Sequence, residues 1–531
     1  MAGVDLDGAD SHAESAAEEA KRAPRWRRRV VVSALTLLTV GVMSAAVFLF
    51  APQPAQTPTP DEASAVLTPG VEVWGTSTSR DFTTTGGTSA PATETVYIDA
   101  ARQRQKLRGV GASLTPSSAE LIAAMPASER RRLLEELFAP DGPVRLNIVR
   151  IPFGGSDFVS EPAATYDDLP AGESDWQLER FSTAADDATL RPVLREIVEI
   201  APNLVIIAAP WSPPAWLKDS ATLEGGRLID DDRVFDTYAR YLTRAVTDYA
   251  AAGLTIHALS VQNEPQARHP DGYPGADLPV DDAARLIERL GPALSDAGLT
   301  TGILAYDHNW SLHPADAAAT PPGEDPHYEY PADLLRTAAA PFITGVAYHC
   351  YSGDATRQSA FHDEFPDREL WLTECSGSHA AGDDDAQIFS STLDWQSRNL
   401  LIATLANWGS AVLTWNLALD PDGGPHRGGC DTCTGVVTIA PDGTVTRNAE
   451  YYVLASVGRF VAPGSAVLPT RQDEGSALSS VAFDTGAGFV AVVFNPDPDE
   501  RVVRFERSDG PSATAVVPGS TLATVVVTSP Q

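Results

Sequence analysis

The sequence predicts an α/β fold: a (β/α)8 barrel with a discontinuous β-sandwich domain beside it, preceded by one transmembrane helix. Three observations support this fold. In the central region, residues 102–464, eight apolar strand-like runs alternate with segments that repeat apolar residues every three or four positions. Before and after that region the chain shows short strands separated by Gly, Pro, Thr and Asp turns. The third observation is a long uncharged run near the N-terminus.

That run, residues 30–51, follows a basic stretch and is long enough to cross a bilayer as a helix with its basic flank inside. Residues 1–29 are then a disordered cytoplasmic tail. Residues 52–70, rich in Pro and Thr, form an extended linker. We therefore expect a single-pass protein of the cell membrane whose remaining chain is extracellular. A cleaved signal peptide and a secreted product are the alternative.

The elements of the two predicted domains follow in chain order. The β-sandwich takes residues 71–101, with strands at 71–74 and 95–98, and residues 465–531, with strands at 478–483, 489–494, 502–505, 514–517 and 522–527. Barrel strands are predicted at 107–111, 144–152, 204–211, 256–265, 302–309, 343–351, 370–375 and 411–419. The clearest helices are predicted at 117–137, 184–200, 232–252, 280–297, 386–408 and 448–460. A doubly wound sheet is the alternative, but the turn at residues 109–112 lacks the third glycine of a dinucleotide-binding motif.

Composition excludes several classes of function. The chain has 531 residues, with 38 Lys and Arg against 71 Asp and Glu, a net charge of −33. Nucleic-acid binding needs clustered cations, so no nucleic-acid partner is expected. The histidines are scattered, with no His-x-His or His-Glu-x-x-His pattern. We therefore predict no metal site and no cofactor, which argues against a metal-dependent barrel hydrolase.

Two of the predicted barrel strands end in a glutamate. One runs into Asn263-Glu264-Pro265, and the other ends at Glu374 and is broken by Ser376-Gly377. Proline has no N–H for a strand ladder, so the polar pair before Pro265 should be presented at the strand tip. In a barrel the carboxyl ends of the strands share one face. Two carboxyls on that face suit a retaining glycosidase, with one as acid/base and one as nucleophile.

The sequence resembles glycoside hydrolase family 30, the family of lysosomal glucosylceramidase and microbial β-1,6-glucanases. The resemblance runs from about residue 71 to the C-terminus and is carried by ordered motifs. These are Arg108-Gly-Val-Gly-Ala112, Asn147-Ile-Val-Arg-Ile-Pro152, Ser156-Asp-Phe158, Ala209-Pro-Trp-Ser-Pro-Pro-Ala-Trp-Leu-Lys218, Asn263-Glu-Pro265, Gly272-Tyr-Pro274, His349-Cys-Tyr351, Thr373-Glu374 and a stretch from Thr414-Trp415 to Pro425.

The resemblance implies a role for each matching residue. Glu264 is the implied acid/base and Glu374 the implied nucleophile. Substrate-binding residues are implied at Arg150, Asp157, Trp211, Asn263, Tyr273, His349, Tyr351 and Trp415. Among these, Arg150 and Tyr351 are expected to contact the nucleophile, Asp157 a sugar hydroxyl and Asn263 the 2-hydroxyl. The three aromatic residues Trp211, Tyr273 and Trp415 are expected to be sugar platforms, whereas His349 could equally be a hydrogen-bonded wall residue.

The expected activity is retaining hydrolysis of β-glucosidic bonds. The expected substrate is a β-glucoside or β-glucan, with a glycolipid as the further candidate. We place β-1,6-glucan ahead of glucosylceramide because the candidate rim segments, 267–271 and 426–433, are polar. The chain differs from the lysosomal enzyme at Cys350, at Ser376 and in the 426–433 segment. A catalytically inactive surface carbohydrate-binding protein and a related β-xylosidase or β-fucosidase are the alternatives.

The four cysteines are expected to pair. Thiols outside the membrane are normally oxidised, and Cys430 and Cys433 can close a small loop. Cys350 and Cys375 follow predicted catalytic positions on adjacent barrel strands, whose spacing of about 4.8 Å is within disulfide reach. We therefore predict two disulfides and no free thiol.

Overall fold

The computed structural model describes residues 70–529, apart from residues 78–79, 81, 269–271 and 381. The predicted tail (1–29) and transmembrane helix (30–51) lie outside the described residues, as does the predicted linker up to residue 69. Within the part of the chain that the structure describes, no helix is long and apolar enough to cross a membrane.

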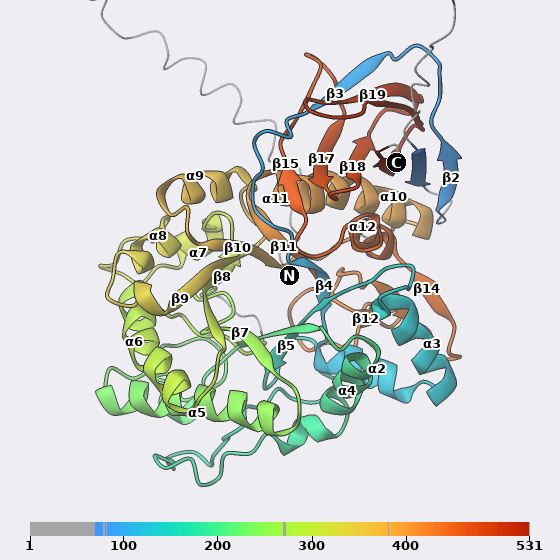
Figure 1. Ribbon diagram of the computed structural model, residues 1–531. Coiled ribbons are helices and arrows are strands. Elements are labelled where there is room, and N and C mark those ends of the chain that lie inside the picture. Colours follow the sequence, from blue (N-terminus) through green and yellow to red (C-terminus); the bar gives the residue numbers. More distant parts are fainter. Residues whose placement is uncertain (1–69, 78–79, 81, 269–271, 381, 530–531) are drawn as a thin grey trace, which may run out of the picture. The chain divides into compact units, whose positions relative to one another are not determined.

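Eight parallel strands close into a barrel, as the sequence predicted (Figure 1). Around the barrel the order is β10-β11-β4-β5-β6-β7-β8-β9. The strands are β4 (Gly109–Ser113), β5 (Ile148–Phe153), β6 (Val205–Pro210), β7 (Ile256–Ser260), β8 (Gly302–Asn309), β9 (Ile343–His349), β10 (Glu369–Glu374) and β11 (Gly409–Asn416). Buried side chains fill the interior, among them Ile207, Leu304 and Trp371. The barrel is therefore a packed core, and its chemistry is confined to its ends.

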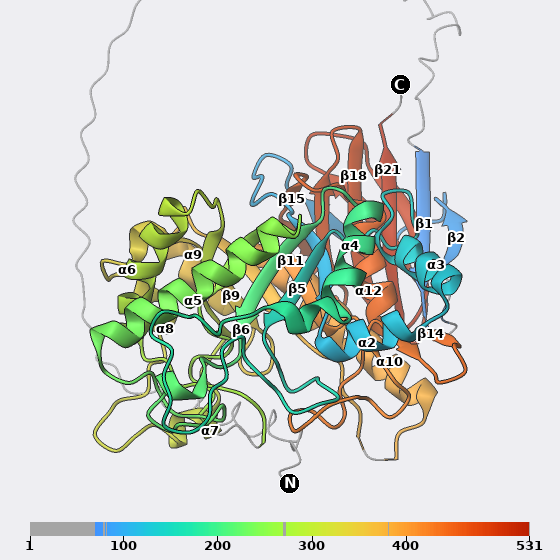
Figure 2. The same ribbon diagram turned by 90° about the horizontal axis from the view of Figure 1, so that it is seen from below.

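Helices cover the outside of the barrel (Figures 1 and 2). They are α2 (Pro116–Ala124), α3 (Ala127–Phe138), α4 (Leu190–Ile200), α5 (Asp232–Ala251), α6 (Val280–Asp296), α7 (Pro314–Ala318), α8 (Tyr330–Leu335), α9 (Thr356–Glu364), α10 (Asp385–Trp395), α11 (Ala403–Ala406) and α12 (Ala449–Gly458). Short 3₁₀ turns occur at Ala184–Asp187, Ala215–Leu217 and Ala340–Phe342.

Three predicted helices are interrupted in the structure. The helix expected at 184–200 is divided into the 3₁₀ turn at Ala184–Asp187 and α4 at Leu190–Ile200. The helix expected at 117–137 is split into α2 and α3, because Pro126 offers no N–H to continue the first helix. The helix expected at 386–408 begins with a capping box at Asp384 and Gln387 but widens into a π-helical stretch at Gln396–Ile402 before α11. Periodicity found all three helical regions, but it did not find these interruptions.

Two further sheets combine strands from both ends of the described chain, and β1, β18 and β21 lie side by side in Figure 2. The six-stranded sheet has the order β15 (Ala466–Leu468), β17 (Ser479–Asp484), β18 (Gly488–Asn495), β21 (Thr521–Thr528), β1 (Gly70–Thr76), β2 (Thr83–Gly86). The four-stranded sheet has the order β16 (Thr470–Gln472), β3 (Glu94–Ile98), β19 (Arg501–Arg507), β20 (Ala513–Val517). Buried residues of both sheets, such as Phe489 and Phe505, belong to one apolar cluster. A small sheet of β12 (Ala418–Leu419), β13 (Val437–Ile439) and β14 (Val445–Arg447) follows the last barrel strand.

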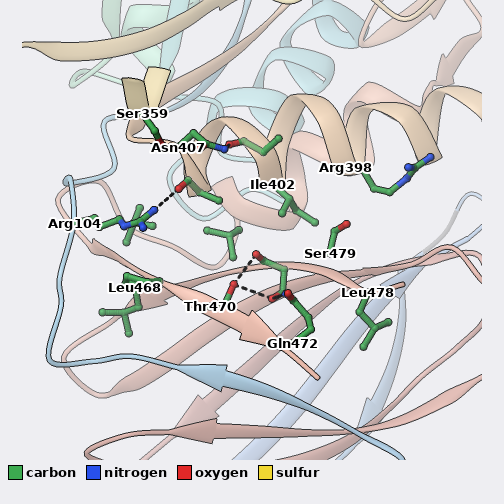
Figure 3. Close-up of a pocket in the computed structure, with 16 residues that line it drawn as sticks. Arg104, Ser359, Arg398, Ile402, Asn407, Leu468, Thr470, Gln472, Leu478 and Ser479 are labelled. Carbon is green, nitrogen blue, oxygen red and sulfur yellow. Dashed lines mark hydrogen bonds between the residues drawn. The ribbon is translucent and has the colours of Figure 1, made fainter. Parts of the chain in front are cut away.

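Hydrogen bonds join the larger sheets to the barrel. Thr524 Oγ1 in β21 donates to the carbonyl of Ser456 in α12 at 2.9 Å. Gln105 Nε2, on the segment between β3 and β4, donates to the carbonyls of Leu405 and Gly409. Beside this seam is a polar cavity of about 410 Å³, shown in Figure 3. None of the described residues that line the cavity was predicted for the active site, so this cavity is separate from the predicted chemistry.

Candidate active site

The carboxyl ends of several barrel strands are irregular where the predicted site lies. The pairing register shifts between Tyr306 and His308 in β8, between Leu372 and Glu374 in β10, and between Thr414 and Asn416 in β11. Such bulges redirect side chains at the rim of a barrel. Here they accompany a cluster of buried polar groups at the strand ends.

Glu374, the last residue of β10, accepts two hydrogen bonds. Arg150 Nη1 in β5 donates to Glu374 Oε2 at 2.6 Å, and the Tyr351 hydroxyl donates to Oε1 at 3.0 Å. The Arg150 side chain is 1% exposed and that of Glu374 8%, so this ion pair is shielded from water. Arg150 and Tyr351 therefore both contact Glu374, and the role of Glu374 as nucleophile stays a prediction.

Glu264 lies beyond the end of its strand rather than on it. β7 ends at Ser260, whereas the prediction extended that strand to residue 265, and this part of the prediction is wrong. Glu264 has a φ of 49°, a left-handed conformation that is uncommon for a residue with a side chain. Its Oε1 lies 3.1 Å from His349 Nδ1. His349 is thus bonded to the carboxyl of Glu264 at the centre of the site.

The two glutamates are close enough to interact directly. One oxygen of Glu264, one of Glu374 and a ring nitrogen of His349 all lie within 4.8 Å of one another. The carboxyls therefore compete for protons, and their titration belongs to the pair. The 16% exposure of the Glu264 side chain, twice that of Glu374, leaves it the more accessible of the two.

The pKa shifts and the hydrogen bonds favour different positions for the shared proton. Burial raises the pKa of Glu374, although His349 and Arg150 oppose that rise. Burial also favours a higher pKa for Glu264, but the neighbouring histidines and Arg150 outweigh it, so the pKa of Glu264 is lowered overall. These opposite pKa shifts, with burial as the main cause of the rise at Glu374, would place the proton on Glu374. The contacts favour Glu264 instead, because a protonated Glu374 would lose acceptor strength toward both Arg150 and Tyr351. Both donors point directly at Glu374, so the contacts outweigh the pKa shifts and Glu264 holds the proton.

Arg150 connects the nucleophile candidate to two other predicted residues. Its Nη2 donates to Asn263 Oδ1 at 2.6 Å, which leaves the amide N–H groups of Asn263 for other acceptors. The guanidinium lies over the ring of Trp211 at 4.9 Å and over that of Trp415 at 5.6 Å. The two indoles are also stacked on each other, with centroids 5.2 Å apart, and both are buried. Their role as sugar platforms stays a prediction.

Asp157 offers a free oxygen at the site. Its Oδ1 is buried and has no hydrogen-bond partner in the described part of the chain. Burial and then the charge of Glu374 raise its pKa well above the usual range. On the other side, a Cβ at Gly429 would lie 2.2 Å from Asp157 Oδ2, so the backbone of the 426–433 loop packs directly against this carboxyl. Tyr273 is half-buried beside the same apolar cluster as Trp211, and the charges of Glu264 and Asp157 add to burial in raising its pKa.

Both cysteine pairs are disulfides in the structure. Cys350 and Cys375 join the ends of β9 and β10, directly after His349 and Glu374. Cys430 and Cys433 close the loop that contacts Asp157. Each cross-link therefore lies next to residues of the candidate site.

Sequence reasoning missed several residues of this cluster, all at the end of β8. Asp307 is fully buried and pairs with Arg150, while Asn309 Oδ1 accepts the backbone N–H of Tyr351 at 2.9 Å. His308 Nε2 lies 3.9 Å from Glu264 Oε1. The signal was present, because Asp307-His308-Asn309 ends an apolar strand in the same way as the glutamates do.

Among the described residues, one group could bring its ligand atoms around a single metal ion, and it consists of Glu264, His349 and Glu374. Both ring nitrogens of His349 are already engaged, Nδ1 with Glu264 and Nε2 with Asp307. Its carboxylate neighbours raise the pKa of the imidazole to about 9 against the opposing effect of burial. A charged imidazole has no lone pair for a metal, so the cluster suits proton chemistry better.

Comparison with known proteins gives one consistent result. The glycosyl hydrolase family 30 TIM-barrel domain matches residues 107–461. An endo-1,6-β-D-glucanase of Neurospora crassa is 31% identical over 421 residues, which cover 77% of this chain and 80% of the relative. The lysosomal acid glucosylceramidase of Mus musculus is 27% identical over 433 residues, which cover 79% of this chain and 81% of the relative.

A solved structure of an endo-β1,6-glucanase superposes with a TM-score of 0.74 at 27% identity, covering 86% of this chain and 98% of that one. The matched region spans the eight barrel strands and the strand ends that carry Glu264 and Glu374. These matches and the closed barrel confirm the resemblance seen in the motifs. The chain belongs to glycosyl hydrolase family 30, and it is a glycosyl hydrolase of the β-glucosidase or glucanase type.

Proposed function

We propose that the protein is a retaining β-glucanase that cleaves β-1,6-linked glucose chains. The observation that carries the mechanism is the approach of the two carboxyls, with oxygens within 4.8 Å of each other. Retaining enzymes hold their carboxyl groups about 5–5.5 Å apart, whereas inverting enzymes leave about 6.5–9.5 Å for a water molecule. The separation therefore supports double displacement.

In the first step Glu374 attacks the anomeric carbon. The C–O bond to the leaving sugar breaks as the Glu264 proton is transferred to the departing oxygen, and an ester forms between glucose and Glu374. In the second step Glu264 takes a proton from water, which attacks the same carbon and releases Glu374. Arg150 and Tyr351 orient the nucleophile and stabilise it when it is released.

The remaining polar groups suit the sugar that carries the reacting carbon. The unpartnered Oδ1 of Asp157 can bond a hydroxyl, and the amide of Asn263 is oriented by Arg150 for the 2-hydroxyl. These assignments agree with the roles that the family motifs imply.

Two observations favour a glucan over a glycolipid. The Neurospora relative named as an endo-1,6-β-D-glucanase has a higher identity than the mouse glucosylceramidase. Large hydrophobic side chains that are exposed among the described residues are Ile229, Tyr328, Tyr351 and Trp395, of which Tyr351 belongs to the catalytic cluster. A ceramide-binding rim would need a larger apolar patch at the site.

The substrate is tested by product analysis at equal enzyme concentration. We expect soluble gluco-oligosaccharides from β-1,6-glucan, and little glucose from glucosylceramide in micelles or sugar from β-1,3-glucan. Release of glucose from glucosylceramide, with none of the glucan cut, would replace the proposed substrate with the glycolipid. Binding of β-1,6-glucan without any product would favour the inactive carbohydrate-binding protein.

We also propose that the enzyme works outside the cell, held there by the segment at 30–51. The support is the basic stretch that precedes this apolar run. Protease treatment of intact cells would digest the catalytic part if this topology is correct, and a protected catalytic part would contradict it.

A further inference from the structure

We propose that Asp307 is the positioning residue that holds both catalytic glutamates, acting on Glu374 through Arg150 and on Glu264 through His349. The proposal rests on the proposed function, because it takes these two glutamates as nucleophile and acid/base. Asp307 itself is not expected to touch the sugar. The contacts, the backbone and the charges of the site each support this role.

The two carboxylate oxygens of Asp307 serve different partners. Oδ2 accepts from Arg150 Nη2 at 2.9 Å, and Oδ1 lies 3.2 Å from His349 Nε2. Thr373, the residue before Glu374, donates its hydroxyl to Oδ1 at 2.6 Å. Asp307 is 0% exposed, so no water competes for these bonds. One carboxylate therefore fixes the two side chains that contact the catalytic pair.

The backbone of Asp307 also supports Glu264. The carbonyl of Asp307 accepts the N–H of Glu264 at 3.0 Å, at the point where Glu264 adopts its φ of 49°. Asp307 and the preceding Tyr306 have φ values of 57° and 73°, and the strand is bulged there. A left-handed conformation is strained for such a residue and persists only where the surroundings enforce it. The bulge is what turns the Asp307 side chain toward Arg150 and His349.

The charges around His349 give Asp307 a second effect. The groups near the ring are Glu264, Asp307, His308, Tyr351 and Glu374, and Arg150 pairs with Asp307. Burial alone would raise the pKa of Asp307, but Arg150, His349 and Thr373 hold it well below its usual range. Asp307 is thus a permanent negative charge that, after Glu374, helps to keep His349 protonated. A protonated His349 stabilises the carboxylate that Glu264 becomes once it has given its proton to the leaving oxygen.

The test is the Asp307→Asn variant, assayed across pH on an activated aryl β-glucoside and on a β-1,6-gluco-oligosaccharide. Without the negative charge the pKa of His349 falls from about 9, so the proton that the site needs is lost at lower pH. We expect kcat to fall about 100-fold, KM to change little, and the alkaline limb of the kcat profile to move down by a unit or more. An equal loss at every pH, with both limbs in place, would show a merely structural role and overturn the proposal.

Asp186→Asn is the matched control, because Asp186 is a half-buried carboxylate that accepts from the hydroxyls of Tyr166 and Tyr249. In this control variant, both limbs of the pH profile of kcat should stay at their wild-type positions. If Asp307→Asn does not fold, NMR titration of wild-type His349, assigned with His349→Gln, decides the question. We expect an imidazolium up to about pH 9, and a ring that titrates near pH 6.5 would overturn the proposal. This titration needs no substrate, so it stands even if β-1,6-glucan proves not to be cleaved.

Discussion

Replacing Glu374 by glycine is expected to stop hydrolysis, with a loss on the order of 10⁴- to 10⁶-fold in kcat, the size seen when a covalent nucleophile is removed. The physical reason is that the carboxylate proposed to attack the anomeric carbon is removed. Arg150 and the Tyr351 hydroxyl would remain, and they would face the space vacated by the side chain. The site is then left with an acid and an anion-binding position but no nucleophile.

Azide is expected to restore turnover in that variant. A small anion can occupy the vacated space beside Arg150 and attack the same carbon, which gives an α-glucosyl azide from a β-glucoside that has a good leaving group. NMR of the product would identify its configuration. Glu369→Gly is the matched control, since Glu369 begins the same strand and pairs with Arg108 at the other end of the barrel. It should keep turnover and form no azide adduct, and an azide adduct from this control would contradict the assignment.

Replacing Glu264 by glutamine is expected to separate substrates by their leaving groups. Substrates with unactivated leaving sugars should lose about 10²- to 10⁴-fold in kcat/KM, the contribution of general acid catalysis. Aryl glucosides with acidic phenols should lose little in the first step, because their leaving group departs without a proton. Steady-state kinetics on a series of phenols would measure this as a steeper dependence of kcat/KM on leaving-group pKa.

The same variant has a defined pH signature. In the wild type, proton transfer to the leaving oxygen requires a proton held by Glu264 and His349 together. Activity should therefore fall as the pH rises above the pKa at which this pair loses that proton. Glutamine has no proton to lose, and the alkaline limb should flatten for activated substrates. An equal loss for activated and unactivated substrates, with the limb unchanged, would show that Glu264 has another role.

Much of this site was predictable because barrel geometry turns sequence positions into neighbours. A residue at the carboxyl end of a buried strand must face the same rim as its counterparts, whatever the distance between them in sequence. That rule placed Glu264 and Glu374 at one rim, whereas the contact between Arg150 and Glu374, 224 residues apart, was implied by the family resemblance. It also led to the Cys350–Cys375 disulfide between adjacent strands.

Other features depend on local backbone geometry that side-chain patterns do not encode. The bulge at Tyr306 and Asp307 turns a polar side chain into the centre of the site, and periodicity gives no sign of the left-handed residues involved. The early end of β7 likewise leaves Glu264 on a turn held by the carbonyl of Asp307. Burial of Trp211 and Trp415 against Arg150 follows from packing across three strands, which one strand's sequence cannot specify.

The most direct test of the account follows the anomeric configuration of the first product. Wild-type enzyme is added to a β-1,6-gluco-oligosaccharide, and proton NMR spectra are recorded before the new reducing end has time to mutarotate. Double displacement through Glu374 predicts that the β-anomer appears first and that the α-anomer grows only later. An α-anomer in the earliest spectra would contradict the proposed mechanism, and with it the roles given to the two carboxyls.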